Sequence, residues 1–250
     1  LIFTEYGKLF WMKVYEVPEG SKNSKGRPIQ NLISLESGDS IRSVINVRTL
    51  SDADYINNNY LIMCTEQGTI KKTLLEAYSR PRTNGIIAIS INEGDRLLDV
   101  ALTNGDNDIV IASSAGRAVR FNEKGVRPMG RTAAGVRGIN ISDDPTNKVI
   151  GMVCINREDA QLLVVSENGF GKRSDIDSYR ITNRGGKGVS TMNATDKVGK
   201  LVAIREVTEQ DDLMIITRNG IAIRMSVLDI RQAGRNTQGV KLIRLNNTDE

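Results

Sequence analysis

Five short apolar runs recur along the chain, and each is followed by a polar turn that ends in glycine and by a basic segment. The runs begin at Leu1, Leu61, Ile109, Leu162 and Leu213, and their turn glycines are Gly7, Gly68, Gly116, Gly169 and Gly220. β-Branched residues favour strands, and a glycine at the end of a short turn supplies the positive φ that a tight hairpin needs. The pattern therefore predicts five β-hairpins.

A second glycine follows each turn glycine 17 to 19 residues later, at Gly26, Gly85, Gly135, Gly188 and Gly239. A period of about 50 residues with several short strands per unit fits a blade of about four strands in a propeller-like array. We predict an all-β fold in one domain over 1–250, with repeats at about 1–50, 51–101, 102–153, 154–205 and 206–250. A single helical turn is expected between Leu74 and Ser79.

The composition is that of a globular protein, with 39% hydrophobic and 26% charged residues. Its apolar runs are far shorter than the roughly 20 residues of a membrane-spanning helix, and no export leader stands at the start. We expect a cytoplasmic location and no membrane partner. Cys64 and Cys154 lie inside apolar runs, which favours buried reduced thiols and leaves a disulfide as the alternative.

The sequence offers little for catalysis. The 250 residues contain no histidine and only two cysteines, which removes the commonest general base and a structural zinc site. No Gly-Lys-Ser or Gly-Lys-Thr motif is present, and the glycines of 169–171 and 185–188 stand in turns. Phosphate-binding and dinucleotide-binding loops are therefore not expected. We predict no catalytic residue, no metal and no cofactor within this chain.

Charge is distributed unevenly along each repeat. The segments from each turn glycine to just past the second glycine (7–29, 68–88, 116–138, 169–191 and 220–242) contain 24 Lys and Arg against 7 Asp and Glu, a net +17. The remaining residues contain 10 against 23, a net −13. A basic segment that recurs in every blade would form a belt, and a belt suits the uniform charge of a phosphate backbone.

The loops before the second glycine combine arginine with small residues, which lets guanidinium and backbone N–H groups approach phosphate oxygens. Aromatic residues make up only 4% of the chain, too few to stack single strands, so double-stranded DNA is favoured. The predicted DNA-binding residues are Lys71, Lys72, Arg80, Arg82, Arg120, Arg127, Arg131, Arg137, Lys172, Arg173, Arg180, Arg184, Lys187, Arg224, Arg231 and Arg235.

Several motifs resemble the C-terminal domain of the A-type subunit of DNA gyrase, a bacterial type IIA topoisomerase, over essentially the whole chain. They are Gly26-Arg27-Pro28-Ile29-Gln30-Asn31-Leu32, Gly94-Asp95-Arg96-Leu97-Leu98, Val126-Arg127-Pro128-Met129-Gly130-Arg131, Gly135-Val136-Arg137-Gly138-Ile139, Gly169-Phe170-Gly171-Lys172-Arg173 and Gly234-Arg235-Asn236-Thr237-Gln238-Gly239-Val240. The resemblance implies a β-pinwheel, in which neighbouring blades exchange strands. It also implies a rim that wraps double-stranded DNA in a right-handed sense and supports negative supercoiling.

By the same resemblance, the partners are the rest of the gyrase A-type subunit, together with the B-type subunit, and ATP and Mg²⁺ are used elsewhere in that isomerase. This domain alone is expected to be non-catalytic. The family has a Gln-Arg-Arg-Gly-Gly-(Lys/Arg)-Gly box in its first blade, and that blade is expected before Leu1. The nearest match here, Arg184-Gly185-Gly186-Lys187-Gly188, lies in a later repeat, where we expect a related phosphate-contact loop. The alternatives are the equivalent domain in the A-type subunit of topoisomerase IV and, in another class, a protein-interaction propeller.

Overall fold

The structure is a computed structural model that describes residues 1–21 and 24–245. Over those residues the strands form four four-stranded sheets and one two-stranded hairpin, so the predicted all-β class with about four strands per repeat is confirmed. The chain divides into two compact units. The first comprises Leu1–Gly105 with Val126–Val136, and the second comprises Asp106–Gly125 with Arg137–Glu250.

The first unit contains two sheets. In spatial order, the first consists of β3 (Ile41–Val44), β1 (Ile2–Thr4), β2 (Lys8–Phe10) and β6 (Ile86–Ile87), and the second of β10 (Val136–Arg137), β5 (Thr69–Leu74), β4 (Tyr60–Thr65) and β7 (Leu97–Thr103). A short helix that the sequence analysis did not predict, α1 (Ala53–Asn58), precedes β4. It begins where the Asp52 carboxylate accepts a hydrogen bond from the Tyr55 N–H, an ordinary helix N-cap.

The second unit contains two further sheets and a hairpin. The third sheet consists of β11 (Val149–Ile155), β8 (Asp108–Ser113), β9 (Arg117–Asn122) and β14 (Val189–Ser190), the fourth of β15 (Leu201–Val207), β12 (Gln161–Ser166), β13 (Phe170–Asp175) and β18 (Val240–Lys241), and the hairpin of β16 (Asp212–Ile216) and β17 (Ala222–Ser226). Short 3₁₀ turns occupy Val14–Glu16, Ile29–Asn31, Leu75–Tyr78, Glu123–Gly125, Ile176–Ser178 and Val227–Asp229. The turn at Leu75–Tyr78 confirms the single helical turn expected there.

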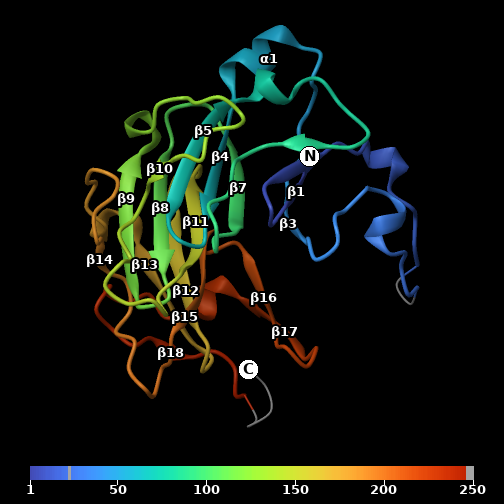
Figure 1. The fold of residues 1–250 in the computed structure, drawn as a ribbon. Helices are drawn as coiled ribbons and strands as arrows, with labels where there is room; N and C mark the ends of the chain where they lie inside the picture. The colour runs from blue at the N-terminus through green and yellow to red at the C-terminus, as the bar shows by residue number, and fades with distance from the viewer. Residues whose placement is uncertain (22–23, 246–250) are drawn as a thin grey trace. The chain divides into compact units, whose positions relative to one another are not determined.

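Each four-stranded sheet takes its last strand from the following repeat (Figure 1). The second glycine of a repeat introduces this short strand, which pairs with the second hairpin strand of the repeat before it. In this way β6 pairs with β2, β10 with β5, β14 with β9, and β18 with β13. The strand exchange that the family resemblance implied is therefore present in the structure.

The predicted hairpin turns are also present. The five turn glycines and the five second glycines all have φ between +68° and +109°. A hydroxyl at the end of the apolar run helps to close four of these turns by accepting the backbone N–H four residues further on: Thr4 from Lys8, Thr65 from Thr69, Ser166 from Phe170, and Thr217 from Ile221. Local sequence thus determines each hairpin before any packing is considered.

The apolar runs are continuous because both faces of the central strands are covered. On β12, Leu162 and Val164 pack in the core between the third and fourth sheets. Leu163, on the opposite face, packs with Val227 and Ile230 beside the β16–β17 hairpin. In the first unit the corresponding core joins the first two sheets around Phe3, Leu61, Met63, Leu75 and Tyr78.

The first repeat differs from the others in one segment. Val14 of its 3₁₀ turn and Val17, the residue that follows the turn, are 80% and 55% exposed. The residues at the equivalent places of later repeats are buried: Leu75 and Tyr78, Ile176 and Tyr179, and Val227 and Ile230. In those repeats the turn packs on the preceding hairpin, so burial comes with strand exchange.

Two further expectations concern the cysteines and membrane segments. Cys64 and Cys154 are buried and form no disulfide, as expected for reduced thiols, and burial raises the pKa of the Cys64 thiol. Within the described ranges, none of the helices is long and apolar enough to cross a bilayer.

Candidate nucleic-acid interface

The basic loops lie along the edge of the preceding repeat. Four loops lead into a strand that completes the sheet before them, and we call three of these, residues 126–135, 179–188 and 231–239, the exchanged loops. Each loop forms a parallel β-bridge with the second strand of the preceding hairpin: Lys72 with Pro128, Arg120 with Ile181, and Arg173 with Gln232. The loop backbone is therefore held, and its side chains are presented from a fixed support.

The hairpin residue four positions after the turn glycine anchors the incoming 3₁₀ turn. Its side chain donates to the same carbonyl in three repeats: Trp11 Nε1 to Tyr78 O at 2.9 Å, Arg120 Nη1 to Tyr179 O at 3.2 Å, and Arg173 Nε to Ile230 O at 2.6 Å. Arg120 also pairs with Asp108 at 2.8 Å, and Arg173 with Glu209 at 2.8 Å. The guanidinium groups of Arg120 and Arg173 therefore donate their hydrogen bonds to groups of the protein itself.

Lys72 occupies the same repeat position and is also buried. Its ammonium lies 4.5 Å from the centre of the Tyr60 ring and 3.3 Å from Gly105 O. Sequence analysis assigned Lys72, Arg120 and Arg173 to DNA contacts. The structure instead engages them within the protein, so we leave them out of the candidate interface.

The hairpin residue three positions after the turn glycine is a fully buried lysine in two repeats. Lys71 Nζ donates to Ala88 O at 2.6 Å and to Arg131 O, and Lys172 Nζ donates to Gly234 O at 2.5 Å and Arg235 O at 2.6 Å. Burial, together with the nearby guanidinium of Arg131, lowers the pKa of Lys71 to about 7. Burial and Arg235 likewise lower the pKa of Lys172 to about 8. Neither ammonium has the exposure that a direct phosphate contact requires, which corrects the sequence-based assignment of both lysines.

Three half-buried arginines connect successive loops. We call Arg131, Arg184 and Arg235, each four residues before the second glycine, the linking arginines. They donate to equivalent carbonyls of the preceding exchanged strand: Arg131 Nη1 to Ile87 O at 3.4 Å, Arg184 Nη1 to Arg137 O at 3.1 Å, and Arg235 Nη1 to Ser190 O at 2.8 Å. Each guanidinium uses only part of its five donors in this bond.

Another repeated arginine points to solvent. Arg127, Arg180 and Arg231 each follow a buried apolar residue, namely Val126, Tyr179 and Ile230. All three are exposed, and within residues 1–21 and 24–245 their guanidinium groups form no hydrogen bond or ion pair. We call them the exposed arginines. Their position at the start of each exchanged loop makes them the strongest candidates for an anionic ligand.

The remaining predicted residues divide between free and paired. Arg80, Arg82 and Arg137 are exposed. Lys187 is exposed and pairs with Asp143 at 2.6 Å, and Arg224 of β17 pairs with Asp212 of β16. Sequence reasoning missed Arg117, which donates to Lys187 O at 3.0 Å and Gly188 O at 2.7 Å. Its place directly after the turn glycine, beside the incoming strand, was the available signal.

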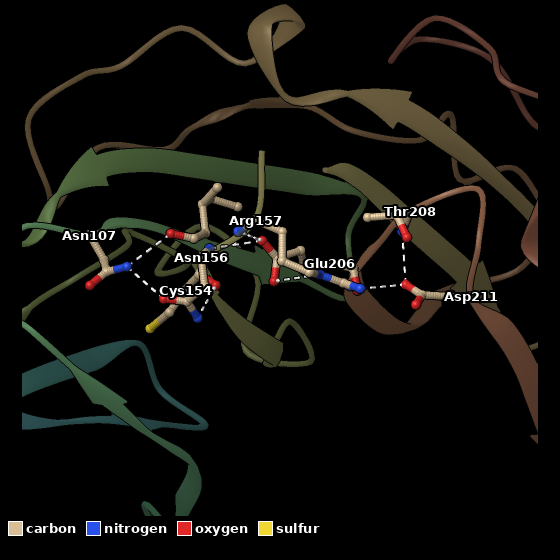
Figure 2. A network of polar contacts seen from close by, with 8 residues as sticks. Asn107, Cys154, Asn156, Arg157, Glu206, Thr208 and Asp211 are labelled. Atoms are coloured by element: carbon tan, nitrogen blue, oxygen red, sulfur yellow. Dashed lines mark hydrogen bonds and ion pairs between the residues drawn. The ribbon is translucent and has the colours of Figure 1, made fainter. Parts of the chain in front are cut away.

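A separate polar network joins the connections between the last three repeats (Figure 2). Asn107 Nδ2 donates to Ile155 O at 2.9 Å, and the Asn156 and Arg157 N–H groups donate to Glu206 at 2.8 and 3.0 Å. Arg157 also pairs with Asp211 at 2.7 Å. This network lies outside the exchanged loops, which contain no Asp or Glu.

Among the residues that the structure describes, no group of three or more Cys, Asp or Glu side chains is placed so that it could hold a metal ion. The charged groups of the exchanged loops are arginine and lysine. Such a surface can bind anions through charge-assisted hydrogen bonds, and arginine suits phosphate oxygens in particular.

The strand-exchanging sheets and the repeated arginine loops define a propeller-like array of blades with a basic loop at each exchange. The chain belongs to the DNA gyrase C-terminal domain family of β-propellers, whose model matches residues 1–48, 59–104, 107–156, 160–208 and 211–250. It is 44% identical over 246 residues to the A-type subunit of DNA gyrase from Staphylococcus epidermidis and, equally, to that from Staphylococcus aureus. These matches cover 98% of this chain and 27% of each relative, so the chain spans about a quarter of their length.

Two solved structures share the fold. The C-terminal domain of DNA topoisomerase IV superposes with a TM-score of 0.86 at 24% identity, covering 97% of this chain and 74% of that one. A DNA gyrase A C-terminal domain superposes with a TM-score of 0.84 at 24% identity, covering 99% and 78%. At this identity the likeness concerns the fold alone, and the assignment to the family rests on the family model.

Proposed function

We propose that this chain binds double-stranded DNA without sequence preference and wraps it, as the DNA-wrapping part of the gyrase A-type subunit. In the complete enzyme it acts with the rest of that subunit, together with the B-type subunit, where ATP and Mg²⁺ are used. The chain itself contributes binding and bending, and no covalent chemistry. It acts in the cytoplasm, where bacterial DNA lies.

The exposed arginines support this proposal most directly. Arg127, Arg180 and Arg231 occupy the same place in three exchanged loops and are free of carboxylate partners in the described chain. A guanidinium binds two phosphate oxygens at once, and contacts to phosphate position a duplex without reading its bases. Bending 20–30 base pairs costs roughly 1–6 kcal/mol, so several repeated contacts are needed to offset it.

Salt dependence tests the proposal. If about 8 phosphates are neutralised, the logarithm of the binding constant falls against the logarithm of salt concentration with a slope near −7. Replacing Arg127, Arg180 and Arg231 together by glutamine removes three contacts and should make the slope shallower by about 3. Fluorescence anisotropy of a labelled duplex, titrated at several salt concentrations, measures both quantities.

Arg48→Gln serves as the control, because Arg48 is exposed, pairs with Asp52 and lies outside the exchanged loops. It should leave the slope unchanged. A wild-type slope shallower than about −2 contradicts DNA binding and favours a protein-interaction propeller, whose affinity would depend little on salt. Equal effects of Arg48→Gln and the triple replacement would remove the exchanged loops from the interface.

A further inference from the structure

Lys71 and Lys172 occupy equivalent places beneath two exchanged loops. Each is the third residue after a turn glycine, in the second strand of its hairpin. Each ammonium donates to the backbone carbonyl of the linking arginine above it, Arg131 or Arg235. A buried amine aimed at the same carbonyl in two repeats fixes the loop at the residue that bonds to the preceding strand.

The third hairpin shows what happens without this lysine. Val119 stands at the equivalent position of β9. The loop above it, residues 179–188, is held differently, because Arg117 reaches Lys187 O and Gly188 O from the turn. Each of the three exchanged loops is therefore anchored by a basic side chain of the preceding hairpin. In two of them this is a buried lysine, and in the third it is Arg117.

We propose that Lys71 and Lys172 are positioning residues for DNA binding, which hold the loops of Arg131 and Arg235 from beneath and thereby set where the arginines of those loops meet the duplex. This inference rests on the proposed function. Neither ammonium touches DNA. Each acts through the carbonyl of the linking arginine that it binds.

The charge of these lysines should change with pH when DNA binds. Burial holds the pKa of Lys71 at about 7 and that of Lys172 at about 8. The groups that face Lys71 are the Arg131 guanidinium and the Tyr78 hydroxyl, which shares the Ala88 carbonyl with it. Lys172 lies beside the Arg235 guanidinium, which covers the Tyr179 ring.

A neighbouring phosphate backbone favours the charged form of a lysine and raises its pKa. Binding therefore takes up protons, and by linkage the affinity falls as pH rises through the pKa values of the free protein. The chain contains no histidine.

The test is a pH series of duplex affinity at fixed salt, from about pH 6.5 to about pH 8.5, with a fluorescently labelled duplex. The wild-type affinity should fall by about tenfold over this range. In the Lys71→Met, Lys172→Met double variant, affinity at the acid end should be about tenfold weaker and its change with pH less than about twofold. Circular dichroism verifies that the variant is folded. If the variant does not fold, the pH dependence of the wild-type affinity tests the inference by itself.

Arg127→Gln is the matched control, because it removes a charge from the surface of an exchanged loop and leaves both buried lysines in place. It should weaken binding at every pH by a similar factor. A flat wild-type profile, or a folded lysine variant with the wild-type affinity and pH dependence, overturns the inference. If Arg127→Gln still weakens binding in that case, the proposed function stands and only the role of the lysines is lost.

Discussion

At the scale of single residues, glycine makes the strand exchange possible at Gly188. Its φ is +73°, and a Cβ added there would collide with the backbone carbonyl oxygen of Ala118 on β9. Two penalties therefore combine, the strain of a left-handed conformation and the loss of close backbone contact between β14 and β9.

Gly188→Ala should reduce the free energy of unfolding by at least about 2 kcal/mol. Gly186→Ala, in the same loop, is the control, because φ there is not positive and the nearest atom to an added Cβ is 3.9 Å away. That change should alter stability by less than about 0.5 kcal/mol. Urea unfolding of the two variants provides the comparison, and equal stabilities would show that the β14–β9 contact tolerates a side chain.

The local sequence did not predict which lysine and arginine side chains are buried and which are exposed. Lys71 and Lys72 are adjacent on a short strand, so alternation suggests that one of them faces solvent. Both are buried, because the loop that covers them comes from residues 128–131 of the next repeat. Arg127 also recurs at a fixed place in the repeats, outside the strands, and it is exposed. Spacing identified the positions of these residues, and long-range packing determined their roles.

At the scale of elements, the sequence predicted the hairpins because their turns are local. Gly68, Gly116 and Gly169 stand between apolar runs, and their positive φ marks the positions of the hairpin turns. The local sequence does not indicate which strand a two-residue strand such as β10 or β14 pairs with, because two residues are too few to show a periodic pattern. The exchange was expected only through the family resemblance, and α1 was missed because its six residues are too short for a helical pattern.

The β16–β17 hairpin should be the least stable β element of the second unit. Over residues 1–21 and 24–245 it pairs with no third or exchanged strand, and Met214 and Ile216 of β16 are 61% and 65% exposed. A two-stranded hairpin is marginally stable on its own. Packing of Leu213 and Met225 beside Leu163 supplies its attachment.

Hydrogen–deuterium exchange should reveal this difference. Amides of β16 and β17 should exchange at least about tenfold faster than those of β12 and β13, which have strand neighbours on both sides. Strands β8 and β9 are the internal control, because they have the same four-stranded setting as β12 and β13. Equal protection of β16–β17 and β12–β13 would mean that side-chain packing alone stabilises the hairpin.

At the scale of the whole molecule, charge separation matters more than net charge. The net charge is only +4, yet the repeated basic segments total +17 and the rest −13. A duplex therefore meets like charge if it leaves the basic loops, and this restricts where it can bind.

Wrapping, as distinct from binding, changes DNA topology. When a nicked plasmid is closed by ligase in the presence of the chain, a right-handed wrap should raise the linking number as protein is added, measured by gel electrophoresis after protein removal. The bend is maintained only where successive loops contact the duplex, since each must offset part of a bending cost of roughly 1–6 kcal/mol. Replacing Arg127, Arg180 and Arg231 by glutamine should therefore abolish the shift at protein concentrations where some DNA remains bound. Binding that leaves the linking number unchanged in the wild type would show that the exchanged loops hold DNA without bending it, and the wrapping proposal would then be wrong.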